Sequence, residues 1–259
     1  MDDFLTQVSI IAPAFIAGLL VLGSHVPLGR EVLGRGIIFL DIAVAQIAAF
    51  GIMLTAFLDL EGHPWLIQLV AIGSALLGAW LLNLSERRFP QFQEAIIGTA
   101  FVLAATGSIL LMAGNPHSAE HLKDILSGQI LWVTQGQLLI LAVFSLGVML
   151  LWWRLPKATR LRWFYPMFAV AITASVQVVG IYLVFSSLII PALAVVQQKQ
   201  RPVLKAWGIG ALGYLLGLLL STLFDLPSGP LIVWLLVASS VSFAMLQRYK
   251  HRKTVSALT

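Results

Sequence analysis

Long apolar runs alternate with short polar gaps along the whole chain. A membrane-spanning helix needs about 20 predominantly apolar residues, and eight runs come close to that length. The pattern predicts an all-α polytopic membrane helical bundle with about eight spans, forming a single transmembrane domain over residues 1–259. The expected spans are residues 7–28, 36–58, 64–84, 94–114, 137–154, 164–184, 206–223 and 229–247.

The apolar stretch 164–197 does not fit a single simple span. Basic gaps flank it on both sides, so the chain should leave the cytoplasm and return, yet two full spans would need about 40 residues. We expect one span to about Val184, a polar break at Ser186 and Ser187, and a short return containing Pro191. The alternative is one long tilted helix kinked at the proline. Broken segments at membrane depth are typical of substrate paths, so both serines are candidate path residues.

Charge gives the bundle an orientation. Of the 259 residues, 59% are hydrophobic and 10% charged, against about 25% charged in soluble domains. Fifteen of the sixteen Lys and Arg residues fall in alternate gaps, and only Lys123 breaks the pattern. Cytoplasmic loops are enriched in Lys and Arg, so we expect the N-terminus outside and the C-terminus inside. This topology explains the net charge of +5; the expected surroundings are a lipid bilayer, and no nucleic acid is expected.

Several chemistries are excluded by what the sequence lacks. There is no cysteine, and no Walker-type phosphate loop, HExxH or GxSxG motif is present. Hydrolysis of ATP, peptide or ester by this chain alone is therefore not expected, and the protein is predicted not to be an enzyme. No permanently bound cofactor is expected.

Two polar residues lie in the second expected span. Asp41 falls in its second turn and Gln46 five residues further on. An intramembrane carboxylate is costly and is by default a functional candidate, so both residues are predicted to line a path. The alternative is that Asp41 pairs with Arg30 or Arg35 near the cytoplasmic surface. Gln177, in the span 164–184, is expected to face the bundle interior and bond to another helix.

Two further patterns concern a loop and a helix pair. His117, Glu120 and His121 cluster in an outer loop, with the histidines spaced as two zinc ligands on one helix face would be. They could contact metal at an outer mouth, or form ordinary polar surface. Gly213 and Gly217 form a GxxxG pair that lets two membrane helices approach closely.

Four short segments, in order along nearly the whole chain, carry a family resemblance. They are Glu94-Ala-Ile-Ile-Gly98, Leu126-Ser-Gly-Gln-Ile-Leu131, the stretch 179–192 with Val179-Gly180 at its start and Pro191-Ala192 at its end, and Asp225-Leu-Pro-Ser-Gly229. Together they resemble the permease subunits of the zinc/manganese/iron family of ABC importers.

The resemblance implies a function and a set of partners. Two permeases would pair as a homodimer in the bacterial inner membrane, and ABC ATPase subunits would drive alternating access from the cytoplasm. A periplasmic metal-binding protein would deliver the transported divalent metal, zinc or manganese. Lys157, Arg160 and Arg162 occupy the family's coupling position and are the expected ATPase contact.

The sequence departs from the family in two places. Family members carry an Asp and a His four residues apart near the start of the second span; here Ile42 and Gln46 stand at those positions, and Asp41 is shifted by one residue. The coupling segment is also reduced to residues 155–162. These departures leave two alternatives: a non-transporting scaffold or regulator of a metal importer, or an ATP-independent secondary transporter.

Overall fold

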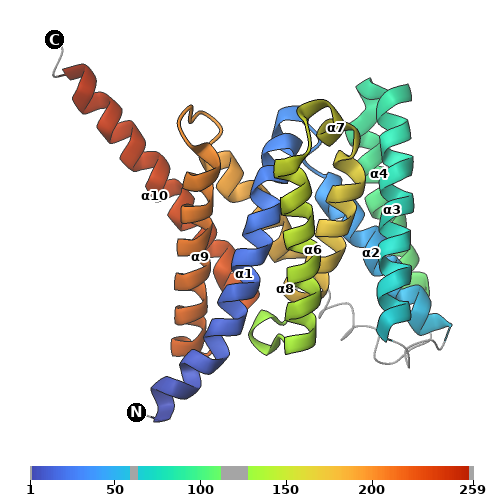
Figure 1. The fold of residues 1–259 in the computed structure, drawn as a ribbon, viewed down its shortest axis with the longest axis horizontal. Coiled ribbons are helices and arrows are strands. Elements are labelled where there is room, and N and C mark those ends of the chain that lie inside the picture. The colour runs from blue at the N-terminus through green and yellow to red at the C-terminus, as the bar shows by residue number, and fades with distance from the viewer. Residues whose placement is uncertain (1, 59–63, 112–127, 257–259) are drawn as a thin grey trace.

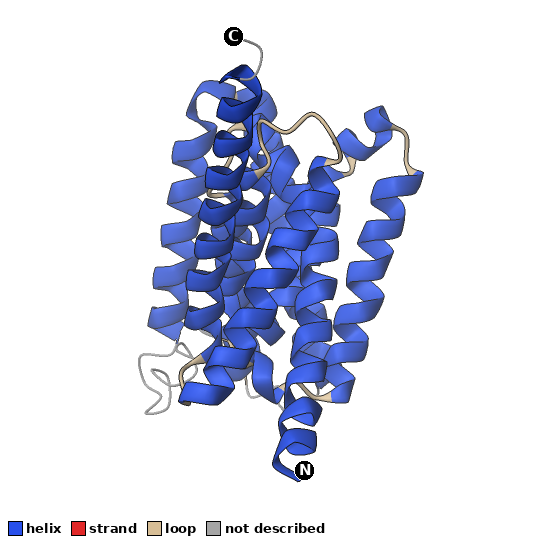
Figure 2. Ribbon diagram, turned by 90° about the vertical axis from the view of Figure 1, so that its left-hand side faces the viewer, coloured by secondary structure: helices blue, strands red, loops and turns tan. Residues whose placement is uncertain are grey.

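The chain folds as a bundle of helices. The computed structural model describes residues 2–58, 64–111 and 128–256, and within them it contains no β-strand (Figure 2). Eight of the described helices are long and apolar enough to cross a membrane, which confirms the predicted fold class. The helices are α1 (Asp2–Arg35), α2 (Leu40–Phe57), α3 (Pro64–Arg88), η1 (Pro90–Phe92), α4 (Gln93–Leu111), η2 (Ile130–Trp132), α6 (Gln135–Arg154), α7 (Lys157–Arg162), α8 (Phe164–Ala194), α9 (Pro202–Phe224) and α10 (Ser228–Ser256).

Arg35 joins several helix ends at one end of the bundle. Its guanidinium bonds to Glu31 at 2.9 Å, lies 3.6 Å from a carboxylate oxygen of Glu86 on α3, and donates to the carbonyl oxygen of Leu161 on α7 at 3.4 Å. It also lies 4.4 Å from the ring centroid of Phe164, the first residue of α8. We call this end, where α1 and α3 finish and α8 starts, the basic end.

The termini lie at opposite ends of the bundle (Figure 1). The C-terminus is at the basic end, where α7 also lies, and the N-terminus is at the other end. Arg30, Trp153 and Arg201 line a common pocket, which places the α8–α9 connection at the basic end as well. The arrangement follows the predicted alternation of basic gaps, and the positive-inside rule assigns the basic end to the cytoplasm.

Helix α8 enters the bundle and returns to the same end. Gly180 interrupts it with φ 77° and ψ 163°, a conformation open essentially only to glycine. Residues 164–179 lead away from the basic end, because Phe164 packs on Arg35. Residues 181–194 lead back, because Arg201 shares a pocket with Arg30. The predicted return is confirmed, and the alternative of one continuous tilted helix is wrong.

The break does not lie at Ser186 and Ser187, where we expected it. Their hydroxyls donate to the carbonyl oxygens of Tyr182 and Leu183 at 2.8 and 2.6 Å, one helical turn earlier. Such back-bonding satisfies serine inside a helix, so the pair does not require a polar break. The return is longer than expected, because it starts at Gly180 rather than beyond the serines.

A second glycine packs against the break. Gly128 has φ 67°, and a Cβ on it would overlap the backbone of Val179 and Gly180. Ile130, two residues on in η2, is 1% exposed. Irregular backbone at membrane depth requires protein or a water-filled cavity beside it, and the segment entering η2 supplies protein. Two of the four segments that carry the family resemblance are therefore in direct contact.

Helix α8 forms the centre of the core, and 78% of its most apolar stretch is buried inside the protein. Helices α1, α2, α3, α6 and α10 pack around it, and α9 packs mainly on α1 and α10. Gly213 and Gly217 of α9 lie against the backbone of α10 at Leu236 and Ile232, where a Cβ would approach their Cα atoms to 3.0 and 2.7 Å. The predicted close approach at this glycine pair is confirmed.

Substitution of the two contacting glycines should destabilise the bundle. Gly180→Ala imposes backbone strain of about 1–3 kcal/mol, and Gly128→Ala adds a steric overlap with Val179. Thermal unfolding in detergent should show a lower Tm for both variants. Gly147→Ala in α6 is the matched control, because a Cβ there meets no atom within 4 Å. Equal melting temperatures for all three variants would contradict the described contact.

The orientation can be tested in intact cells, because the chain has no cysteine. Single cysteines at Gln135 and Ser228, at the end opposite the basic end, should react with a membrane-impermeant thiol reagent. Cysteines at Lys157 and Arg201 should react only after the membrane is permeabilised. The reverse labelling pattern would overturn the topology.

Candidate functional site

Asp41 is an unpaired carboxylate in the protein interior. It lies in the first turn of α2 and is 1% exposed. Neither carboxylate oxygen has a hydrogen-bond partner among the described residues. Buried carboxylates are normally paired, hydrogen-bonded or bound to a metal, because an isolated charge is very costly in a low dielectric. The structure therefore leaves Asp41 available for a ligand.

The predicted alternative for Asp41, pairing with Arg30 or Arg35, is not observed. Arg35 is engaged by Glu31 and Glu86. Arg30 lines a pocket with Trp153 and the start of α9, and no ion pair to Asp41 occurs within the part of the chain that the structure describes.

Gln46 is the second polar group inside α2. It is 5% exposed, and its Oε1 atom has no partner among the described residues. Because the oxygens of Asp41 and Gln46 are both unpartnered, the two side chains do not bond to each other. Carboxylate and amide oxygens are donors that suit hard divalent cations. Whether the two residues bind one ion stays a prediction.

The other predicted path residues are not hydrogen-bonded to this pair. Ser187 is fully buried, and its hydroxyl lies 2.8 Å from that of Tyr214 on α9, in addition to its bond within α8. Ser186 bonds to Tyr182. Both serines thus have structural partners, and Asp41 and Gln46 do not. The cluster of His117, Glu120 and His121 lies outside the described residues.

Two further interior groups have an unpartnered atom, and one of them, His25, was missed by the sequence analysis. His25 on α1 is 0% exposed; its Nδ1 lies 3.0 Å from the hydroxyl of Ser24, and its Nε2 has no described partner. Thr173 on α8 is 1% exposed and also has an unpartnered oxygen. A histidine inside an apolar run was the available signal. Even so, no group of three or more His, Asp or Glu side chains able to hold a metal occurs in the described residues.

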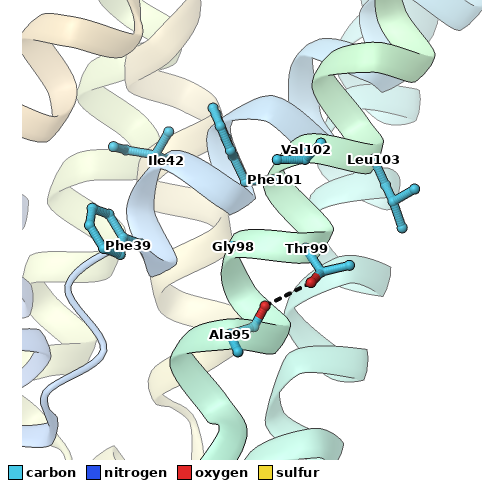
Figure 3. A pocket seen from close by; sticks show the side chains of 8 residues that line it. All are labelled: Phe39, Ile42, Ala95, Gly98, Thr99, Phe101, Val102 and Leu103. Carbon is cyan, nitrogen blue, oxygen red and sulfur yellow. Dashed lines mark hydrogen bonds between the residues drawn. The ribbon is translucent and has the colours of Figure 1, made fainter.

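A cavity of about 660 Å³ lies beside the start of α2, between Phe39, Ile42 and one face of α4 (Figure 3). Thr99 is the lining residue with a polar side chain, and its hydroxyl already donates to the carbonyl oxygen of Ala95 at 2.8 Å. An apolar lining of this kind offers no side-chain ligand to a cation. The cavity is therefore not a metal site, although Ile42 directly follows Asp41.

The three predicted ATPase contacts, Lys157, Arg160 and Arg162, all lie on the short helix α7, but their surroundings differ. Arg160 donates to the carbonyl oxygen of Trp152 at 3.1 Å and lies 4.8 Å from its ring centroid, so it fastens α7 to α6. Lys157 and Arg162 are exposed and have no bond to the described residues. Of the three predicted contacts, Lys157 and Arg162 are therefore the two that are free to meet another protein.

Gln177 differs from its prediction. Its neighbours Thr173 and Ser175 are buried, but Gln177 is exposed on the surface of the protomer. It lies 13 residues into α8, about 20 Å along the helix from the basic end at 1.5 Å per residue. A polar side chain at such depth avoids lipid, so this surface requires a polar covering.

Comparison with known proteins decides the family. The model of the ABC 3 transport family matches residues 7–169 and 156–247. The chain belongs to the ABC 3 transport family. The two matched pieces overlap at residues 156–169, which contain the short α7 and the start of α8. The permease is thus a membrane transport subunit rather than a catalytic enzyme. None of the curated proteins compared with it matches.

Solved structures share the fold of the permease. PsaBC from Streptococcus pneumoniae in complex with Fab matches with a TM-score of 0.76 and 20% identity over 97% of this chain and 99% of that chain. An inward-facing metal-chelate type ABC transporter matches with a TM-score of 0.67 and 20% identity over 91% of this chain and 85% of that chain.

Proposed function

We propose that the permease imports a divalent metal ion, with Asp41 as the charged group of the path. The unpartnered, 1% exposed carboxylate carries this proposal. A divalent cation would supply the compensating charge that the described protein does not. Family membership supports transport, and it disfavours the alternative of a scaffold without transport activity.

The donor atoms favour manganese over zinc. Imidazole suits zinc, whereas carboxylate and carbonyl oxygens suit manganese. Asp41 and Gln46 offer only oxygens as acceptors, and a glutamine amide replaces the imidazole that the resemblance led us to expect. Water molecules and the partner protomer would complete the coordination, since two protein ligands are too few for either metal.

A second protomer would cover the exposed polar surface at Gln177. A homodimer with this surface facing its partner, or a water-filled path between protomers, removes the amide from lipid. We therefore propose that α8 contributes to the path on both its faces, through the buried residues on one side and Gln177 on the other.

Energy would come from separate ABC ATPase subunits bound at the basic end, with Lys157 and Arg162 as contacts. A periplasmic metal-binding protein would deliver the ion to the opposite end, and the assembly would reside in the bacterial inner membrane. An ATP-independent secondary transporter is the second candidate; it is disfavoured by the family match, which places the chain among ABC transport proteins.

Removal of the Asp41 charge tests the path. Asp41→Asn retains shape but should abolish metal uptake, and Asp41→Glu should retain part of it, because the charge is what attracts a cation. Asp225→Asn is the matched control: it also removes one carboxylate, but from an exposed position where the backbone has φ 51°, which asparagine tolerates. Uptake by the Asp41→Asn variant equal to that of the wild type would exclude Asp41 from the path.

Charge reversal on α7 tests the ATPase contact. The double variant Lys157→Glu/Arg162→Glu should lose the ATPase on purification, or hydrolyse ATP without transport, because both side chains are exposed and free. Arg160 is left intact, since it holds α7 on Trp152. Arg87→Glu/Arg88→Glu, at the end of α3, makes the same charge change elsewhere on the basic end. An intact, coupled complex in the α7 variant would move the contact to residues 198–205.

A further inference from the structure

A shallow pocket of about 390 Å³ lies at the basic end, on the side of the molecule formed by α1, α6 and α9. Arg30 of α1, Trp153 of α6 and the first residues around α9, including Arg201, Leu204 and Trp207, line it. None of these residues belongs to the proposed path or to α7. The pocket therefore needs an explanation of its own.

The pocket is held in place by interhelical contacts. Trp207 donates from its ring nitrogen to the carbonyl oxygen of Leu22 at 3.0 Å, which fixes the start of α9 against α1. One turn further along α9, Gly210 packs against the side chain of Leu22. The pocket thus lies over a tight helix junction rather than in a loose loop.

The lining residues mark the depth at which three spans leave the hydrocarbon. Trp153 is the penultimate residue of α6, Arg30 lies five residues before the end of α1, and Arg201 directly precedes α9. Trp153 is 55% exposed and Leu204 57% exposed. Tryptophan is typical of the headgroup level, so the pocket opens where lipid headgroups meet acyl chains.

Both guanidinium groups of the pocket are free. Arg30 and Arg201 are exposed, and neither guanidinium makes a hydrogen bond or ion pair with the residues that the structure describes. Two other cations at this end are engaged instead: Arg35 by Glu31 and Glu86, and Lys205 by the amide oxygen of Gln198 at 2.7 Å. Two unpaired guanidiniums beside exposed apolar side chains complement a molecule with an anionic head and an apolar tail.

We propose that this pocket binds one anionic phospholipid of the cytoplasmic leaflet. Arg30 and Arg201 bind the phosphate, and Trp153, Leu204 and Trp207 contact the glycerol and upper acyl region. Arginine binds phosphate oxygens with two parallel hydrogen bonds, and basic pockets between helices on the cytoplasmic side are typical sites for anionic headgroups. An acidic protein surface could pair with the two arginines, but it would make no contact with the exposed apolar side chains of Trp153 and Leu204.

Native mass spectrometry of the full-length permease in detergent tests the proposal. Dioleoylphosphatidylglycerol should bind more tightly than dioleoylphosphatidylcholine, whose headgroup has no net charge. Arg30→Gln/Arg201→Gln should weaken phosphatidylglycerol binding about 30-fold, from the contribution of two basic residues near an anionic leaflet. Arg87→Gln/Arg88→Gln, which removes two exposed arginines from the end of α3, should leave the affinity unchanged. Arg30→Lys/Arg201→Lys should retain most of it.

Three results would overturn the proposal. They are equal binding of both lipids by the wild type, undiminished phosphatidylglycerol binding by the Arg30→Gln/Arg201→Gln variant, and binding of glycerol 3-phosphate as tight as that of the lipid, which would indicate a site for a soluble phosphate. If the Gln variant instead lost the ATPase while lipid binding was unchanged, the pocket would be a protein contact. Circular dichroism and thermal melting of each variant check that binding is compared between folded proteins.

Discussion

The fold depends on the reversal of α8 at Gly180. In the hydrocarbon every backbone polar group must be satisfied within the protein, so a chain that turns back inside the bundle needs a residue able to adopt φ 77° and a neighbour to cover it. Gly128 supplies that neighbour through a contact too close for any side chain. The reversal allows a stretch too short for two full spans to leave the basic end and return, and it makes α8 the element around which most other helices pack.

The interior that results is apolar, with few unpaired polar groups. The serines of the returning segment bond within α8 and to Tyr214, whereas Asp41 and Gln46 on α2 retain free oxygens. The basic end shows the same contrast among cations. Arg35 and Arg160 fasten helices together, whereas Arg30, Arg201, Lys157 and Arg162 remain free for lipid or protein. The functions that we propose rest on these unpaired groups.

Most of the fold could be predicted from the sequence, because hydropathy and the Lys/Arg alternation respond directly to the bilayer. The return of α8 could be predicted from charge alone, because basic segments flank the stretch 164–197 on both sides. Its position could not, because polarity points to Ser186 and Ser187, whereas the backbone requires a glycine at the break and both serines are satisfied inside a helix. Gln177 was misplaced for a related reason: polarity shows that a side chain avoids lipid, but not whether its own protomer or another one covers it. The unpaired state of Asp41 depends on contacts between helices far apart in sequence, so no local pattern could show it.

Uptake by proteoliposomes is the measurement that tests ATP-driven metal import by the permease. The permease would be reconstituted with its ATPase and supplied with radioactive manganese or zinc at the face opposite the basic end. We expect accumulation that requires ATP hydrolysis, persists when ion gradients are dissipated, and is faster for manganese. Uptake that follows an ion gradient without ATP, or no uptake of either metal by an intact complex, would contradict it.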